Sequence, residues 1–318
     1  METQQALAGQ ALKAIFKLKK YIYHFANIKI SHIFDLFDKL ILPIMNYAGE
    51  VWGFSSGEAI ERVHLQFCKQ ILGVRVQTQS DFIYGELGRH TIRHHRLLAI
   101  IRFWYKVITS DNSKHIKLIY NILLDDMDRY PNKKSWVSNV KYILDHLGFS
   151  DVWLSQSIGN FDSFISIFKQ RSNDCFLQDW NSRIDNSTRA ISYRLFSNFS
   201  FSSYLDTINI KKFRTALTRL RLSSHKLEIE AGRWQPNRKP IEERLCSVCN
   251  KLEDEFHFVM ECSLFIDLRK MYVKPYYWKR PNIPKFIALI SSENKNTIQK
   301  LATFIHKSFI RRNNFLVL

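Results

Sequence analysis

The chain has 318 residues, and its 47 basic and 29 acidic side chains give a formal net charge of +18 with histidines neutral. A hydrophobic fraction of 46% and an aromatic fraction of 14% argue against a disordered chain, and the length suffices for about two domains with cores of their own. The basic excess favours a polyanionic partner, with charge-aided solubility as the alternative.

Targeting signals are not evident in the sequence. No apolar run approaches the roughly 18 residues that a membrane-spanning helix needs, and lysines interrupt the apolar N-terminal segment, so we expect neither a membrane partner nor a secretion signal. The odd number of cysteines, five, fits a reducing compartment. We therefore expect an intracellular protein of the nucleus or cytoplasm, and the oligomeric state is left open.

Apolar residues recur at three- and four-residue spacing along most of the chain, and only 10 glycines and 7 prolines interrupt it. The predicted helices cover 31–44 with a kink near Pro43, about 58 to a stop at Gly73, 90–109, 114–127, 135–147 and 161–184. The expected fold class is therefore all-α, a multi-helix bundle with a small C-terminal module.

The character of the chain changes near residue 210. A further helix is predicted there with one basic face and one apolar face. The basic face carries Lys211, Arg214, Thr218, Arg221 and His225, and the apolar face carries Phe213, Ala216, Leu217 and Leu220. A stiff basic connector with Gly232, Pro236 and Pro240 follows this helix.

The most specific chemical signal follows that connector. Cys246, Cys249, His257 and Cys262 form the pattern C-x2-C-x7-H-x4-C, in which two cysteines share a tight turn and a helical segment projects the histidine inward. Four soft or borderline ligands with no open position suit one structural Zn²⁺. The alternatives are unrelated thiols with a surface histidine, or a redox pair, which the absence of a βαβ pattern disfavours.

Several sequence runs resemble the C-terminal part of the reverse transcriptases of non-LTR (LINE-type) retrotransposons. The runs are KLILP at 39–43, YAGEVWG at 47–53, IERVH at 60–64, FCKQILG at 67–73, YGELG at 84–88, FR at 213–214 and GRW at 232–234, followed by the cysteine and histidine motif. The resemblance implies a thumb-like helical region at 1–110, a helical linker bundle at 111–210, and a basic helix, CCHC zinc knuckle and basic C-terminal segment at 211–318.

The resemblance also implies that this chain is not an enzyme as it stands. Polymerisation needs palm aspartates that hold two divalent metal ions, and in the family these lie N-terminal to the matched region. The adjacent acidic pair Asp125-Asp126 follows a helical run downstream of the thumb-like match, so a solvated helix end is the preferred interpretation. We expect a truncated fragment without palm or endonuclease.

The charge pattern of the last third favours binding of RNA, DNA or both. Residues 241–263, around the motif, carry a net charge of −4, whereas 211–240 carry +7 and 264–318 carry +9. We expect zinc to hold two basic arms together, so that both meet the phosphate backbone. The expected contacts are Lys211, Lys212, Arg214, Arg219, Arg221, Arg233, Arg238, Lys239, Lys274, Tyr276, Tyr277, Trp278, Lys279 and Arg280, whose aromatic members either stack on bases or pack. The alternative is a zinc-stapled protein–protein interaction module that binds no nucleic acid.

Overall fold

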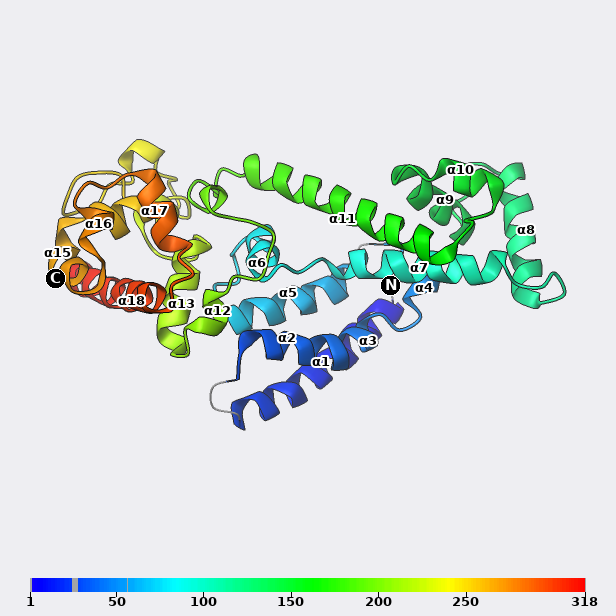
Figure 1. The fold of residues 1–318 in the computed structure, drawn as a ribbon, viewed down its shortest axis with the longest axis horizontal. Helices are drawn as coiled ribbons and strands as arrows, with labels where there is room; N and C mark the ends of the chain where they lie inside the picture. Colours follow the sequence, from blue (N-terminus) through cyan, green and yellow to red (C-terminus); the bar gives the residue numbers. More distant parts are fainter. Residues whose placement is uncertain (1, 25–27, 56, 318) are drawn as a thin grey trace. The chain divides into compact units, whose positions relative to one another are not determined.

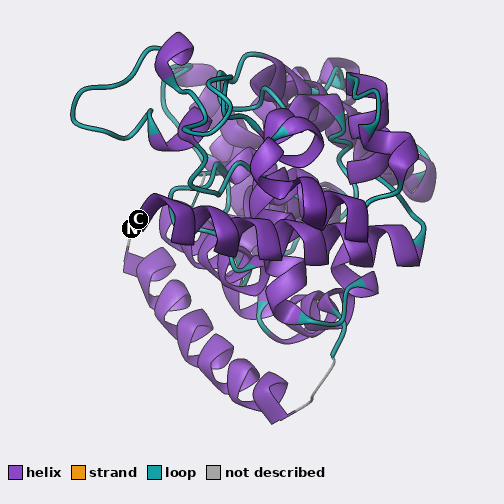
Figure 2. Cartoon of the chain, turned by 90° about the vertical axis from the view of Figure 1, so that its left-hand side faces the viewer, coloured by secondary structure: helices purple, strands orange, loops and turns teal. Residues whose placement is uncertain are grey.

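The computed structural model describes residues 2–24, 28–55 and 57–317. Within these ranges the chain folds into helices and loops without a β-strand, as Figure 2 shows. The only pairing of the strand type there is an isolated antiparallel bridge between Leu245 and Leu252. The all-α fold class is therefore confirmed.

The helices are labelled in Figure 1. They are α1 (Glu2–His24), α2 (Ile30–Leu40), α3 (Leu42–Met45), α4 (Gly49–Trp52), α5 (Glu58–Leu72), α6 (Ser80–Leu87), α7 (Ile92–Ile108), α8 (His115–Arg129), α9 (Trp136–His146), α10 (Ser150–Ser155) and α11 (Phe161–Asp185). The second half of the chain adds α12 (Tyr204–Thr207), α13 (Lys211–Arg221), α14 (Glu228–Ala231), α15 (Ile266–Tyr272), α16 (Pro275–Trp278), α17 (Ile283–Ile290) and α18 (Lys295–Val317). Single turns η1 (Tyr193–Leu195), η2 (Ile241–Glu243), η3 (His257–Glu261) and η4 (Ser263–Phe265) complete the order. No helix in the described ranges combines the length and the hydropathy that crossing a membrane requires.

The predicted helix boundaries agree with the structure where the sequence carries a stop signal. The stretch predicted as one kinked helix is divided into α2 and α3, and Pro43 lies in the first turn of α3, where its missing N–H is tolerated. Helix α5 ends at Leu72, and Gly73 follows with φ +70°, a left-handed conformation that favours glycine.

The described chain divides into two compact units that are discontinuous in sequence. Unit 1 comprises 1–20, 36–64 and 90–181, and unit 2 comprises 21–35, 65–89 and 182–318. The chain thus passes from one unit to the other within α1, α2, α5 and α11 and between α6 and α7. The division into three consecutive regions that the sequence led us to expect, 1–110, 111–210 and 211–318, stays a prediction.

Unit 1 is built around an aromatic and aliphatic core from α7 to α11. Trp104, Val140 and Phe168 are completely buried in it, and Trp153 lies nearly parallel to Trp104 with ring centroids 6.2 Å apart. The indole N–H of Trp104 donates to the hydroxyl of Tyr120 at 3.0 Å. Because each of these helices buries one face in this core, its apolar residues recur at helical spacing, and the sequence from 90 to 184 therefore predicts the helices well.

Unit 2 is organised around α18, which packs against α12, α13, α15 and α17. Figure 1 shows α18 in red among these orange and green elements. Leu301, Phe304 and Ile305 on α18 are completely buried, as are Leu217 and Leu220 on α13. The metal motif lies in the segment between α14 and α15, so it belongs to this unit.

Candidate metal centre

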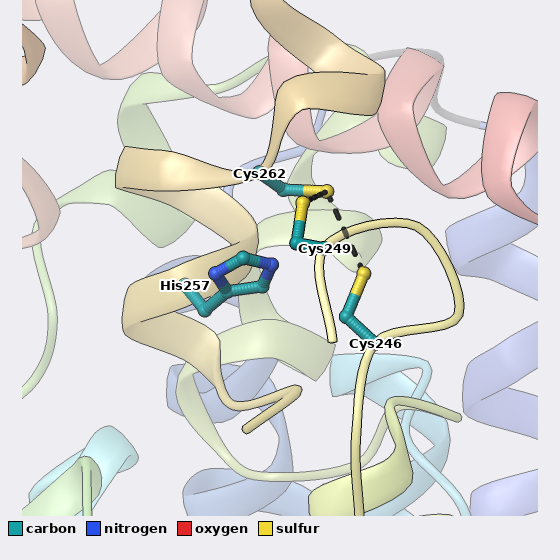
Figure 3. Close-up of side chains that lie close together, drawn as sticks. All are labelled: Cys246, Cys249, His257 and Cys262. Atoms are coloured by element: carbon teal, nitrogen blue, oxygen red, sulfur yellow. Dashed lines mark hydrogen bonds between the residues drawn. The ribbon is translucent and has the colours of Figure 1, made fainter. Parts of the chain in front are cut away.

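The first pair of motif cysteines lies in a short reversing loop of unit 2. The bridge between Leu245 and Leu252 closes this loop around Cys246 and Cys249. Asn250 has φ +52°, and asparagine tolerates this left-handed conformation better than most residues. The reversal brings the two thiols to the same side of the loop, as expected for a C-x2-C pair (Figure 3).

The other two motif residues come from the helical segment that follows. His257 begins the π-helical turn η3, and Cys262 lies directly after its end. The carboxylate of Asp254 accepts the backbone N–H of His257 at 2.7 Å and so caps the segment. The expected helical presentation of the histidine is therefore confirmed.

The four side chains point toward a common centre, as Figure 3 shows. Their ligand atoms all lie within 4.8 Å of one another. The Sγ atom of Cys262 is 3.9 Å from that of Cys246 and 3.8 Å from that of Cys249. A tetrahedral ion about 2.3 Å from each thiolate requires sulfur separations of about 3.8 Å. The cluster is therefore close enough to bind one metal ion.

The imidazole of His257 fits the role of a metal ligand. The side chain is buried, and neither ring nitrogen has a hydrogen-bond partner among the described residues. Burial lowers the pKa of His257, against a smaller opposing effect of Glu261, so the ring is neutral at neutral pH. Glu261 Oε2 lies 3.6 Å from Nδ1, which leaves Nε2 for the metal. A buried imidazole without a hydrogen bond is costly unless an ion satisfies it.

The thiols differ in their surroundings. Burial raises the pKa of the Cys262 thiol, and the neighbouring thiols of Cys246 and Cys249 raise it further. At Cys249, burial is outweighed by the hydroxyl and backbone N–H of Ser263, which lower the pKa of the thiol. These two Ser263 atoms lie 3.3 and 3.4 Å from the Cys249 sulfur. Cys249 therefore gives up its proton more readily than Cys262 does.

A buried arginine lies behind the cluster. Arg269 on α15 is 2% exposed, and its guanidinium donates to the carbonyl of Val259 at 2.8 Å and to that of Cys262 at 2.9 Å. Burial lowers the pKa of Arg269, while the thiolates of Cys262 and Cys249 oppose that change. Three thiolates and one divalent cation sum to a charge of −1, so a buried cation at this position offsets the charge of the loaded site.

Part of the acidic charge expected on the surface around the motif lies inside unit 2. Glu253 is 6% exposed and forms a bidentate ion pair with Arg312 of α18, with atom separations of 2.6 and 2.5 Å. Glu255 is 3% exposed, and its Oε1 lies 2.8 Å from Nε2 of His225. The hydroxyl of Ser192 donates to its other oxygen at 2.8 Å. Two of the six carboxylates of 241–263 are thus buried and bound by side chains inside the unit, which weakens the repulsion expected between this module and phosphate.

The structure distributes the predicted nucleic-acid contacts over three environments. Those that are exposed are Lys211, Lys212, Arg219, Arg238, Lys274, Tyr276, Lys279 and Arg280. Those that are half-buried are Arg214, Arg233, Lys239, Tyr277 and Trp278. Among the half-buried set, Arg233 pairs with Glu230, Lys239 pairs with Glu228, and the Trp278 indole donates to Val273 O. The remaining residue is Arg221.

Arg221 does not lie on an exposed basic face, contrary to the expectation from helical spacing. It is 5% exposed, its guanidinium binds the Glu86 carboxylate at 2.6 and 3.2 Å, and it donates to the carbonyl of Ile290 at 2.8 Å. Thr218 and His225 of the same expected face are also buried. The reason is that α13 is covered on this side by other parts of unit 2, so the position of Arg221 in the structure excludes a phosphate contact.

Other residues around these sites carry no local sequence signal. Arg75 and Lys226 are basic residues that share one cavity lining with Lys211, Lys212 and Arg219. Arg75 comes from a segment more than a hundred positions earlier in the chain, and only the fold brings it there. Trp234, the last residue of the run GRW, is 59% exposed, so this run does contain an exposed aromatic side chain near the site.

The chain matches no protein-family model, and neither the curated proteins nor the solved structures contain a significant match to it. Its fold and candidate metal centre therefore rest on the sequence and geometry described above.

Proposed function

We propose that this chain binds nucleic acid and holds one structural Zn²⁺. The main support is that unit 2 contains both a cluster of four potential metal ligands and a set of exposed cations on the segments that flank this cluster. The net charge of residues 211–318 is +12, which is two thirds of the excess on the chain. Cations concentrated in this way favour a polyanion.

Zinc is the proposed ion because of the donor set. Three thiolates and an imidazole select a soft or borderline cation, and four protein ligands leave no position for a substrate or a water molecule. The ion supplies cross-linking in this role. Its ligands join the loop before Leu252 to the start of α15, and the surrounding ion pairs connect that module to α18.

The resemblance to the C-terminal part of non-LTR reverse transcriptases supports the same function. We propose that the chain corresponds to the thumb, helical linker and zinc knuckle of such a protein, and that it retains nucleic acid without catalysing polymerisation. The acidic group at the end of α8 is consistent with this, because Asp126 forms an ion pair with Lys133 at 2.8 Å.

The test is equilibrium binding of the full chain to labelled single-stranded RNA, single-stranded DNA and duplex DNA at several salt concentrations. Phosphate contacts predict that log K falls linearly with log salt, by about 0.7 per contact for single strands and about 0.9 for duplex. Metal analysis of the same preparation is expected to give one zinc per chain. Absence of binding to all three probes would refute the proposed function, whereas binding without zinc would refute only the metal assignment.

A further inference from the structure

A cation-lined trough runs along the seam between α13 and α18 in unit 2. A cavity of about 960 Å³ is lined by Lys211, Lys212 and Arg219 of α13 and by His306, Ile310 and Asn313 of α18. The α18 residues are four and three positions apart, and Thr215 of the same lining is four positions from both Lys211 and Arg219, so each helix presents one face to the cavity. We call the space between these faces the α13–α18 trough.

The trough continues beyond this first cavity. A second cavity of about 830 Å³ shares Arg75, Lys226 and Asn313 with the first, and it extends to Leu316 of α18 and to Trp234. The ten-residue rise from His306 to Leu316 corresponds to about 15 Å at 1.5 Å per residue. A channel of this length is suited to a segment of extended polymer.

The charged side chains that line the first cavity are positive. Five cations line it, namely Arg75, Lys211, Lys212, Arg219 and Lys226, and no aspartate or glutamate does. None of the five forms an ion pair within the described ranges. Burial and the nearby charge of Arg219 lower the pKa of Arg75, as expected where cations are crowded together. Such crowding is unfavourable in the free protein and is relieved by a polyanion.

The walls of the trough also offer apolar contacts. Ile210 is 52% exposed and Ile310 is 49% exposed in the first cavity. In the second cavity the Trp234 ring is exposed, and the guanidinium of Arg189 lies over it with 5.3 Å to the ring centroid. Glu228 and Glu230 also line this second cavity, where they form ion pairs with Lys239 and with Arg189. An aromatic ring that is held in place next to the cationic first cavity is a platform on which an unpaired base can stack.

We propose that the α13–α18 trough binds single-stranded nucleic acid, with phosphates on the five cations and a base on Trp234. This inference rests on the proposed function and assigns it to a specific surface. A duplex keeps its bases paired and offers no free face to Trp234 or to the isoleucines, so a single strand fits the lining better. An acidic peptide is the other polyanion of suitable width, but it carries no aromatic bases for Trp234.

The experiment compares two triple variants of the full chain that lose the same charge. The trough variant is Lys211→Gln, Lys212→Gln, Lys226→Gln. The control variant is Lys270→Gln, Lys295→Gln, Lys300→Gln, which removes three exposed lysines of the same unit that lie outside the trough and outside the predicted contacts. The probe is a labelled oligothymidylate of about 12 nucleotides, titrated at several salt concentrations.

The trough variant is expected to reduce the slope of log K against log salt by about 2, because three phosphate contacts of about 0.7 each are lost. The control variant is expected to keep the wild-type slope and affinity. Trp234→Ala is expected to weaken binding by about fivefold to 150-fold, and Trp234→Phe is expected to restore most of it. Because all these side chains are exposed, the variants are expected to fold, and circular dichroism checks this.

The outcomes separate the two levels of the proposal. Equal losses in the trough and control variants would overturn the trough assignment while leaving nucleic-acid binding in place. Preferred binding of a duplex of the same length, or of a polyglutamate peptide, would also overturn it. Failure of the wild-type chain to bind any nucleic acid would overturn the proposed function itself.

Discussion

Glu253 provides a quantitative test of how the metal module is joined to the helical body of unit 2. Its carboxylate forms the bidentate pair with Arg312, and its Oε2 also accepts the backbone N–H of Glu228 at 2.7 Å. The two side chains of the pair are 8% and 7% exposed. Glu253→Gln removes the charge with little change in shape and leaves the guanidinium buried without a counter-ion.

The expected cost is large. Removing one partner of a buried ion pair destabilises a protein by about 3–5 kcal/mol, because the remaining charge is uncompensated. For a unit of this size each kcal/mol lowers the melting temperature by about 2–4 °C, so Glu253→Gln is expected to lower it by about 6–20 °C. Thermal unfolding followed by far-ultraviolet circular dichroism measures this shift.

Two further variants make the Glu253 test specific. Glu242→Gln removes an exposed carboxylate from the same module and is expected to change the stability by less than about 0.5 kcal/mol. The double variant Glu253→Leu, Arg312→Met replaces both charges with apolar groups and is expected to recover much of the loss. If Glu253→Gln melted within about 2 °C of Glu242→Gln, the buried ion pair would not join the module to α18 as argued.

Three other results are expected. Zinc binding to the metal-free chain at pH 7 should release protons, because burial raises the pKa of the Cys262 thiol and a thiol must lose its proton to bind the metal. Acidification should therefore weaken zinc binding. An indicator dye in dilute buffer measures the released protons, and the absence of any release would contradict this expectation. Arg221→Met should lower the free energy of unfolding by about 3–5 kcal/mol in urea denaturation, since it leaves a buried carboxylate unpaired, whereas an unchanged denaturation midpoint would contradict the buried location. Arg269→Met should accelerate zinc loss to a chelator relative to Lys270→Met on the exposed side of the same helix, and equal rates would show that Arg269 does not stabilise the site.

The sequence predicts most of the long helices up to α13 and the four clustered cysteine and histidine side chains, but it does not predict α15 to α18. Helical periodicity is a local signal, and Gly73 and Pro43 mark helix ends through their own backbone preferences. The C-x2-C-x7-H-x4-C spacing is local as well, since all four ligands lie within one short segment whose loop and turn bring them together. Such features do not depend on how distant segments pack.

The sequence was not sufficient to tell which charges are exposed. Arg221 and its partner Glu86 are 135 residues apart, and Arg312 and Glu253 are 59 apart. Helical spacing gives the angle at which a side chain leaves its helix, but it does not say what covers that side. Arg221 was therefore expected on an exposed face, and Glu253 and Arg312 were both summed in the charges of their segments. The trough, which needs Arg75 beside α13, could not be predicted at all.

We propose that a zinc centre holds together the unit that binds single-stranded nucleic acid. The most direct measurement is the affinity of the Cys249→Ser chain for the oligothymidylate, with Cys175→Ser, a cysteine outside the cluster, as its matched control. We expect Cys249→Ser to lose its zinc together with most of its oligonucleotide affinity, and Cys175→Ser to keep both. A Cys249→Ser chain that has no zinc but binds the oligonucleotide with wild-type affinity and salt dependence would contradict it.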